Sequence, residues 1–239
     1  MKTAIISGTS GLVGMQVLHQ ILKNPEYDYV ISVGRRKLAL KHQKLVQISG
    51  DILEISNWNW ADMMVEEDIK GDFQNLKVSI ESGETEIHAF CSLGTTIKAA
   101  GSQEKFRVID HDMVLALATW AKSIGTKKFL YVSALGADAN SSVFYNKVKG
   151  EVEDDLKALD FDFLGLFRPS LLLGNRNEFR FGEQVASILM KPLVWLKLLK
   201  NIRPVYDYQV AKAMVVTALQ DSSSKVEIIP SGLIQDISK

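Results

Sequence analysis

A glycine-rich turn directly follows the first apolar segment of the chain. Residues 2–7 are typical of a buried strand and residues 12–23 of a helix, and Gly8, Gly11 and Gly14 have G-x-x-G-x-x-G spacing across the junction. Glycine permits a tight turn and a close approach of the backbone, and a helix N-terminus offers unpaired N–H groups with partial positive charge. The turn therefore predicts a pyrophosphate site in a dinucleotide-binding fold. The alternative is an ordinary glycine-rich strand-to-helix turn.

Strand-like and helix-like patterns alternate along most of the 239 residues. Short apolar runs separated by segments of helical periodicity are typical of βαβ units with right-handed crossovers. The expected fold is α/β, a doubly wound parallel sheet of the NAD(P)-binding Rossmann type. The expected strands are residues 2–7, 29–33, 45–48, 87–91, 128–132 and 163–167, and the expected helices are residues 12–23, 104–123 and 142–159.

No repeat or Pro/Gly-rich linker divides the chain. We therefore expect residues 1–239 to form a single Rossmann domain, in which residues 175–239 contribute much of a small C-terminal substrate lobe. Residues 53–82 are acidic and are expected to be irregular. The further elements expected are helical stretches at 179–190 and 192–200, a strand at 203–206, a helix at 207–220 and a strand at 225–229.

Composition excludes several classes of protein. Lys and Arg equal Asp and Glu at 28 each, so no overall field favours nucleic acid, and none is expected as a partner. The single cysteine, Cys91, cannot form an internal disulfide, the N-terminus lacks the pattern of a secretory signal, and no apolar run is long enough to span a bilayer. We therefore expect a cytoplasmic protein without an integral membrane segment. The four histidines lack metal-ligand spacing, so no metal is expected.

The end of the second expected strand indicates which dinucleotide is bound. An acidic residue there would bond the ribose 2′-hydroxyl of NAD, whereas arginine suits the 2′-phosphate of NADP. This chain has Arg35 and Arg36 and no acidic residue, which favours NADP(H), with NAD(H) left open and a solvated surface pair as the alternative. Asp51 and Ile52, after the third strand, are expected near the adenine.

A second motif carries chemistry. Tyr145 and Lys149 stand at i and i+4 of an expected helix and so share one face. A tyrosine, whose ordinary pKa is about 10, can act as an acid or base near neutrality only if a neighbour such as an ammonium group stabilises its phenolate. Ser133, at the end of the fifth expected strand, has a hydroxyl that could hold a substrate carbonyl oxygen.

These motifs, in this chain order, resemble the short-chain dehydrogenase/reductase superfamily. The resemblance extends through residues 167–174, which are similar to the segment that lines the nicotinamide pocket in extended and atypical members. Residues 91–96, 133–138 and 148–153 resemble more narrowly the atypical branch around the human Tat-interacting protein and its bacterial relatives. Together these segments extend the resemblance over essentially the whole chain.

The resemblance implies a role for each matching residue. Tyr145 is implied to exchange a proton with the substrate oxygen, Lys149 to lower the pKa of Tyr145 and hold the nicotinamide ribose, and Ser133 to orient the carbonyl. Arg168 and Pro169 are implied beside the carboxamide. The other implied cofactor contacts are Gly8, Thr9, Ser10, Gly11, Leu12, Val13 and Gly14 along the pyrophosphate and Leu93, Gly94 and Thr95 along the adenosine half.

Two regions leave alternatives open. Many members of the superfamily have an asparagine in the helix after the fourth strand, where it supports a proton relay, but this chain has Asp110, His111 and Asp112 there. His111 is either a substitute in that relay or, as we prefer, a packed or surface histidine. The apolar segment 185–200, divided by Pro192, is core, a lid, a dimer contact or a membrane-surface patch.

Two classes of function follow. The first is an NADP(H)-dependent oxidoreductase that acts on a small carbonyl or alcohol substrate, with Tyr145 as general acid or base. The second is an NADPH-sensing regulatory protein that binds a partner protein and has little or no catalysis, which the departure at residues 110–112 slightly favours. A nucleotide-sugar epimerase or dehydratase shares the fold, but the chain is short for one. A homodimer is left open.

Overall fold

The computed structural model describes residues 1–58, 72–174 and 202–239, and its main feature is a seven-stranded parallel sheet in the order β3-β2-β1-β4-β5-β6-β9. The chain winds outward from β1 in one direction and then crosses back to continue from β4 in the other. This doubly wound order confirms the predicted Rossmann-type α/β fold. The strands are β1 (Lys2–Ser7), β2 (Tyr29–Gly34), β3 (Leu45–Ser49), β4 (Glu86–Cys91), β5 (Thr126–Val132), β6 (Phe163–Arg168) and β9 (Val226–Pro230).

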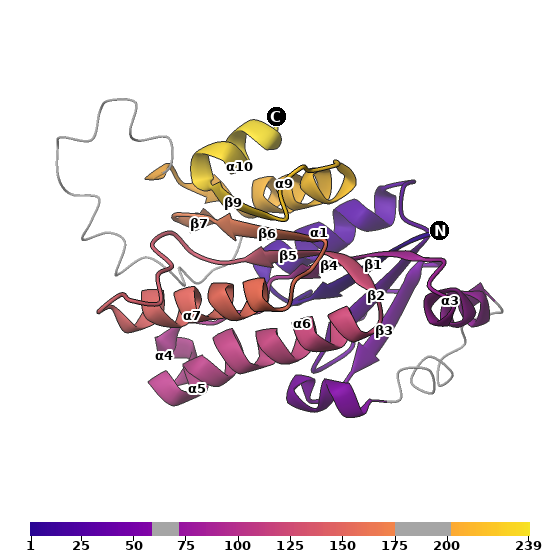
Figure 1. The fold of residues 1–239 in the computed structure, drawn as a ribbon, viewed down its shortest axis with the longest axis horizontal. Helices are drawn as coiled ribbons and strands as arrows, with labels where there is room; N and C mark the ends of the chain where they lie inside the picture. The colour runs from indigo at the N-terminus through magenta and orange to yellow at the C-terminus, as the bar shows by residue number, and fades with distance from the viewer. Residues whose placement is uncertain (59–71, 175–201) are drawn as a thin grey trace.

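Helices cover both faces of the sheet (Figure 1). Two separate apolar clusters, one on each face, explain why the central strands carry apolar side chains on both of their faces. One face carries α1 (Leu12–Lys23), α9 (Asp207–Leu219) and α10 (Ser231–Ile237), and the other carries α3 (Asp72–Glu81), α4 (Ile97–Ala100), α5 (Gln103–Arg107), α6 (Met113–Ser123) and α7 (Phe144–Ala158). Within the described ranges, none of the helices is long and apolar enough to cross a membrane.

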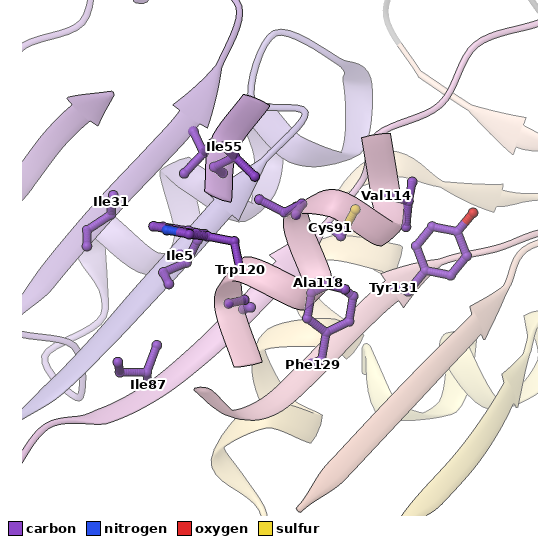
Figure 2. Close-up of a cluster of buried hydrophobic side chains, with 14 of the residues drawn as sticks. Ile5, Ile31, Ile55, Ile87, Cys91, Val114, Ala118, Trp120, Phe129 and Tyr131 are labelled. Atoms are coloured by element: carbon purple, nitrogen blue, oxygen red, sulfur yellow. The ribbon is translucent and has the colours of Figure 1, made fainter. Parts of the chain in front are cut away.

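The larger apolar cluster fixes α6 against the centre of the sheet. Figure 2 shows Trp120 of α6 lying over isoleucines of β1, β2 and β4, including Ile5, Ile31 and Ile87. Burying each such side chain contributes about 1.5–3 kcal/mol. Tyr131 of β5 belongs to the same cluster, but its hydroxyl points away from the other labelled side chains. The Tyr131 hydroxyl is therefore a polar group at the edge of an otherwise apolar core.

The structure corrects the prediction that residues 53–82 are irregular. A short 3-10 helix, η1 (Ile52–Asn57), and α3 occupy the two ends of this range. Asp51 caps η1 by accepting a hydrogen bond from the Leu53 N–H at 3.1 Å. The six residues of η1 are too few to show a helical periodicity, which is why the sequence pattern missed this helix.

Short elements in the carboxyl-terminal part were also missed. β7 (Leu172–Leu173) pairs with β8 (Val205–Tyr206) in a separate two-stranded sheet, and α10 follows β9 directly. The expected strands at 203–206 and 225–229 and the helix at 207–220 are confirmed with small shifts of their bounds. The predicted helices at 179–190 and 192–200, and the interpretations of segment 185–200, lie outside the described residues.

A buried histidine lies near the amino ends of the strands, away from the glycine turn. His88 is fully buried on β4, with Nδ1 2.8 Å from the Tyr27 hydroxyl and Nε2 2.8 Å from Glu86 Oε1. Because the Glu86 carboxylate can only accept, Nε2 carries the proton and Nδ1 accepts from Tyr27. Burial lowers the pKa of His88 to about 4, although the hydrogen bond with Glu86 acts in the opposite direction. His88 is therefore neutral in the folded protein near pH 7.

We expect His88 to destabilise the protein in mild acid. The unfolded chain binds a proton at His88 below its ordinary pKa of 6.5, whereas the folded protein does so only near 4. The stability present above pH 6.5 is therefore lost as the pH falls toward 4. Between pH 7 and pH 4.5 this linkage should lower the free energy of unfolding by about 2 kcal/mol, and urea titrations at the two pH values would measure it.

His88→Gln removes this part of the pH dependence. The matched control is His19→Gln, because His19 is exposed, and it should retain the pH dependence of the wild type. A His88→Gln variant whose loss of stability between the two pH values equals that of the wild type would contradict the assignment.

Candidate active site

The glycine turn is shaped by backbone-to-backbone contacts. Gly8 has a φ of +83°, in the left-handed region that favours glycine, and its carbonyl accepts a hydrogen bond from the Gly11 N–H at 2.8 Å. A Cβ placed on Gly8 would lie 2.6 Å from the backbone oxygen of Ser92, and one on Gly14 would lie 2.2 Å from the Gly8 oxygen. Side chains are excluded at both positions, so the backbone itself forms the surface of the turn.

Helix α1 begins at the turn with its N-terminus uncapped by any side chain and with no acidic residue in its first turn. The hydroxyl groups of Thr9 and Ser32 share a buried hydrogen bond of 3.0 Å, which ties the turn to β2. A helix N-terminus without a competing carboxylate or hydroxyl attracts an anion. Residues 8–14 thus fit the pyrophosphate of a dinucleotide, with Ser10, Leu12 and Val13 in the same turn.

The carboxyl ends of β2 and β3 lie beside this turn, because parallel strands end at one edge of the sheet. Arg35 and Arg36 follow β2 and are both exposed, which leaves their guanidinium groups in contact with solvent. Asp51 follows β3, and Ile52 after it is buried. The carboxylate of Asp51 is held by the N–H of Leu53, so it acts in the structure as a helix cap.

The loop after β4 approaches α7 through its glycine. The Thr95 N–H donates to Asp110 Oδ2 at 2.7 Å, and a Cβ on Gly94 would lie 3.2 Å from Asp110 Oδ1. Leu93 packs on the larger apolar cluster. Of the three residues predicted along the adenosine half, Thr95 is therefore fastened to a carboxylate that the sequence did not single out as a site residue.

Asp110 lies on a π-helical turn, η2 (Val108–Asp112), that joins α5 to α6. The single helix predicted at 104–123 is thus three segments, with the wider turn in the middle. Such turns within α-helices occur frequently at functional sites. Asp110 Oδ1 lies 2.8 Å from the Nζ of Lys149.

Lys149 is buried on α7. Its Nζ donates to the Tyr131 hydroxyl at 2.8 Å and pairs with Asp110, and its side chain is only 4% exposed. Burial acts to lower the pKa of Lys149, but the Asp110 carboxylate and the hydroxyls of Tyr131 and Tyr145 overcome it and hold the pKa well above its ordinary value. The ammonium group is therefore charged at every physiological pH.

Tyr145 lies one helical turn before Lys149, as predicted. It is half-buried, with its ring 5.5 Å from the ring of Phe106. Burial raises the pKa of Tyr145, the charge of Lys149 lowers it, and Asp110 raises it. The tyrosine and the lysine are thus brought together, and the charge of Asp110 also acts on the pKa of Tyr145.

Ser133 has a different partner from the one the resemblance implies. Its hydroxyl is buried and donates to Glu153 Oε1 at 2.5 Å, one turn beyond Lys149 on α7. Arg168 donates to both oxygens of Glu153, from Nε at 2.9 Å and from Nη2 at 2.5 Å. Pro169 is buried beside it, and its carbonyl accepts from Leu135 at 3.0 Å. Ser133 and Arg168 thus meet at a buried carboxylate.

His111 is a packed residue, as preferred from the sequence. Its Nδ1 lies 2.8 Å from Asp112 Oδ1 and its Nε2 2.9 Å from Asp155 Oδ2 on α7, and the residue is buried. These contacts join η2 to α7 and leave the histidine without a contact to Lys149 among the described interactions. Within the described residues, no cluster of three or more His, Cys, Asp or Glu side chains could hold a metal ion.

Sequence reasoning missed three residues of this site. Asp110 and Tyr131 bind Lys149, and Glu153 binds Ser133. Only Asp110 carried a signal, because it stands where many superfamily members have asparagine. The charged residue Glu153 follows Lys149 by four positions on the same helix face, but a carboxylate in that position is usually solvated.

The comparisons identify relatives of nearly full length, although no family model matches. The mitochondrial protein FMP52 of Eremothecium gossypii is 32% identical over 243 residues, which cover 99% of this chain and 97% of the relative. FMP52 of Saccharomyces cerevisiae is 32% identical over 239 residues, covering 98% and 95%. HTATIP2 of Rattus norvegicus is 36% identical over 185 residues, covering 77% and 69%.

Solved structures share the fold at low identity. The UDP-glucose 4-epimerase of Thermotoga maritima has a TM-score of 0.61 and 16% identity, covering 99% of this chain and 80% of that chain. The Bordetella bronchiseptica enzyme WbmH, solved with NAD⁺, has a TM-score of 0.61 and 17% identity, covering 100% and 79%. Such identities show the NAD-binding fold alone. A nicotinamide dinucleotide cofactor is supported, without a choice between NAD(H) and NADP(H).

The expectation of a cytoplasmic protein is contradicted by these relatives. The FMP52 proteins of several yeasts are named as mitochondrial. The physical reason for the error is plain, because one cysteine and no secretory pattern argue only against an oxidising compartment. They do not distinguish between compartments that keep thiols reduced.

We expect Gly14→Ala to damage the turn. The added methyl group would lie 2.2 Å from the Gly8 oxygen, so the backbone of the turn or the helix must move. The free energy of unfolding should fall by about 1–3 kcal/mol, and NADPH should bind more weakly in a fluorescence titration. The matched control is Gly34→Ala, whose Cβ would make an ordinary contact of 3.6 Å, and it should remain as stable as the wild type. Unchanged stability and NADPH affinity in Gly14→Ala would refute this account.

Proposed function

Because the chain belongs to the family of the FMP52 and HTATIP2 proteins, an atypical branch of the short-chain dehydrogenase/reductase superfamily, we propose that it is an NADP(H)-dependent oxidoreductase. Its substrate is a carbonyl compound or the corresponding alcohol. The observation that carries the proposal is the buried, charged Lys149 one helical turn from Tyr145, at the edge of the sheet that also holds the glycine turn. A structural helix rarely buries an ammonium group, because the charge must be desolvated.

The turn at residues 8–14 holds the pyrophosphate in this proposal. Its glycines leave backbone N–H groups and the uncapped start of α1 facing an anion. Arg35 and Arg36 bind the 2′-phosphate, and the loop at residues 93–95 follows the adenosine half. When bound, the nicotinamide donates or accepts the hydride.

Tyr145 acts as the general acid or base. In the reducing direction its hydroxyl gives a proton to the substrate oxygen, and the Lys149 ammonium stabilises the phenolate that results. Ser133 has a positioning role in this proposal, because its hydroxyl donates to the carboxylate of Glu153, one turn beyond Lys149 on α7.

Arg168 also donates to Glu153. Together the two residues hold α7, which carries Tyr145, against the ends of β5 and β6. Of the expected substrate lobe, residues 202–239 are described, and residues 175–201 lie outside the described ranges.

Tyr145→Phe should abolish turnover and spare cofactor binding. Removing the proton donor lowers the rate by about 10²–10⁴-fold, followed as NADPH absorbance with a panel of aldehydes, ketones and quinones. NADPH affinity, measured by fluorescence, should stay within about twofold, because the aromatic ring remains and only the hydroxyl is lost. Tyr208→Phe is the matched control, since Tyr208 is exposed on α9, and should keep full activity. A fully active Tyr145→Phe would exclude the proposed mechanism.

The two arginines should set the preference for NADPH. A guanidinium on a phosphate contributes about 1.5–3 kcal/mol, so Arg35→Ala with Arg36→Ala should weaken NADPH binding by about tenfold or more. NADH lacks the 2′-phosphate, so its affinity should not change. Lys41→Ala, another exposed cation of this region, serves as the control. Equal dissociation constants of the wild type for NADPH and NADH would remove the preference from the proposal.

Two observations favour the regulatory alternative. The hydroxyl of Ser133 donates to the Glu153 carboxylate, and burial raises the pKa of Tyr145. Both are expected of a fold that binds NADPH and reports its occupancy to a partner protein. Silence toward the whole substrate panel, together with tight NADPH binding and an NADPH-dependent protein partner, would establish this function instead.

A further inference from the structure

A buried ionic cluster joins three elements at the proposed site. Lys149 of α7 lies between Asp110 of η2 and Tyr131 of β5, with its Nζ 2.8 Å from Asp110 Oδ1 and 2.8 Å from the Tyr131 hydroxyl. The two charged side chains are 4% and 1% exposed. Removing one partner of such a pair leaves an uncompensated buried charge. Asp110 therefore supplies the counter-charge that the buried ammonium group requires.

The same carboxylate also holds a loop. Asp110 Oδ2 accepts the backbone N–H of Thr95 at 2.7 Å, so the two oxygens of one side chain bind two different elements. Gly94 makes this approach possible, because a Cβ there would lie 3.2 Å from Asp110 Oδ1 and 3.7 Å from the Nζ of Lys149. Asp110 thus connects the loop after β4 with the lysine of α7.

The neighbouring residues of η2 do not share this role. Asp112 contacts His111, and His111 contacts Asp155 of α7. Of the three polar residues at positions 110–112, Asp110 is the one whose described contacts reach Lys149.

We propose that Asp110 is a positioning residue for the reaction: its carboxylate holds the Lys149 ammonium beside Tyr131, one helical turn from Tyr145, and fastens the Thr95 loop to the same point. This inference rests on the proposed function, since it concerns the group that would move the proton. It assigns the aspartate a direct ion pair with the lysine at the place where many superfamily members have a neutral asparagine.

The effect of Asp110 on Tyr145 follows from the charges around it. Lys149 interacts electrostatically with Tyr145, Tyr131 and Asp110. The charges of Lys149 and Asp110 also act on the buried thiol of Cys91. The positive charge of Lys149 lowers the pKa of Tyr145, and the negative charge of Asp110 raises it. Without the carboxylate, the ammonium group would act on the phenol alone. The phenolate of Tyr145 would then form at lower pH.

The first experiment measures that ionisation directly in the whole chain. Tyrosine is labelled with ¹³C at Cζ, the Tyr145 signal is assigned with Tyr145→Phe, and its shift is followed from neutral to alkaline pH by NMR. In Asp110→Asn the titration should move to lower pH. In the control Asp112→Asn, which removes an exposed charge from the same turn, it should not move. An Asp110→Asn titration that coincides with the wild type in a folded protein would overturn the proposal.

The second experiment tests the tether to the loop. Asp110→Ala removes both acceptors and leaves the Thr95 N–H without its partner, so NADPH should bind about tenfold more weakly, measured by fluorescence titration. Asp112→Asn should bind as the wild type does. Unchanged NADPH affinity in a folded Asp110→Ala would show that Asp110 does not hold the loop for the cofactor. If Asp110→Ala does not fold, the NMR titration of Asp110→Asn still decides the proposal.

These measurements are separable from the test of function. Neither measurement needs a substrate. A shifted Tyr145 titration in Asp110→Asn would therefore support the role of Asp110 even if the wild type turned over none of the substrates tested. Conversely, a catalytically essential Tyr145 with an unshifted titration in Asp110→Asn would retain the oxidoreductase and reject the role of Asp110.

Discussion

A buried ammonium group needs an opposite charge at contact distance, and the ion pair of Lys149 with Asp110 meets that requirement here. The surrounding elements are arranged to bring the two together. The π-helical turn carries Asp110, β5 supplies the Tyr131 hydroxyl from the edge of the core, and Gly150 lets α7 lie against the backbone of residues 138–139, where a Cβ would be 2.1 Å from Ala139 N. The ion pair thereby connects the packing of α7 with the placement of the charge beside Tyr145.

Helix α7 presents its chemistry along one face. Tyr145, Lys149 and Glu153 follow one another at intervals of four residues, so each lies about one turn from the next. The first faces the substrate in our proposal, the second carries the charge that acts on the first, and the third binds Ser133 and Arg168. A helix anchored at two buried ionic contacts can hold a reactive phenol without a large movement.

The sequence predicted the parts of the structure that depend on local pattern. The strands and the glycine turn could be identified because apolar runs and glycine spacing are read within a few residues, and the Tyr145–Lys149 pair because it lies within one turn. The partners of Lys149 and Ser133 could not, because Asp110 and Glu153 meet them only through the packing of distant segments. The prediction of the cellular compartment was wrong for another reason, because composition indicates the redox environment and not the organelle.

The π-helical turn has a consequence for comparing this chain with its relatives. A turn of this kind accommodates one more residue than a regular α-helical turn, so the phase of the side chains before it differs from the phase after it. Matching by position from the start of α5 and matching from the end of α6 therefore give registers that differ by one residue. Residues equivalent to Asp110 should be identified by the atom they place beside the lysine, and a gap placed in this helix is a structural event rather than an alignment error.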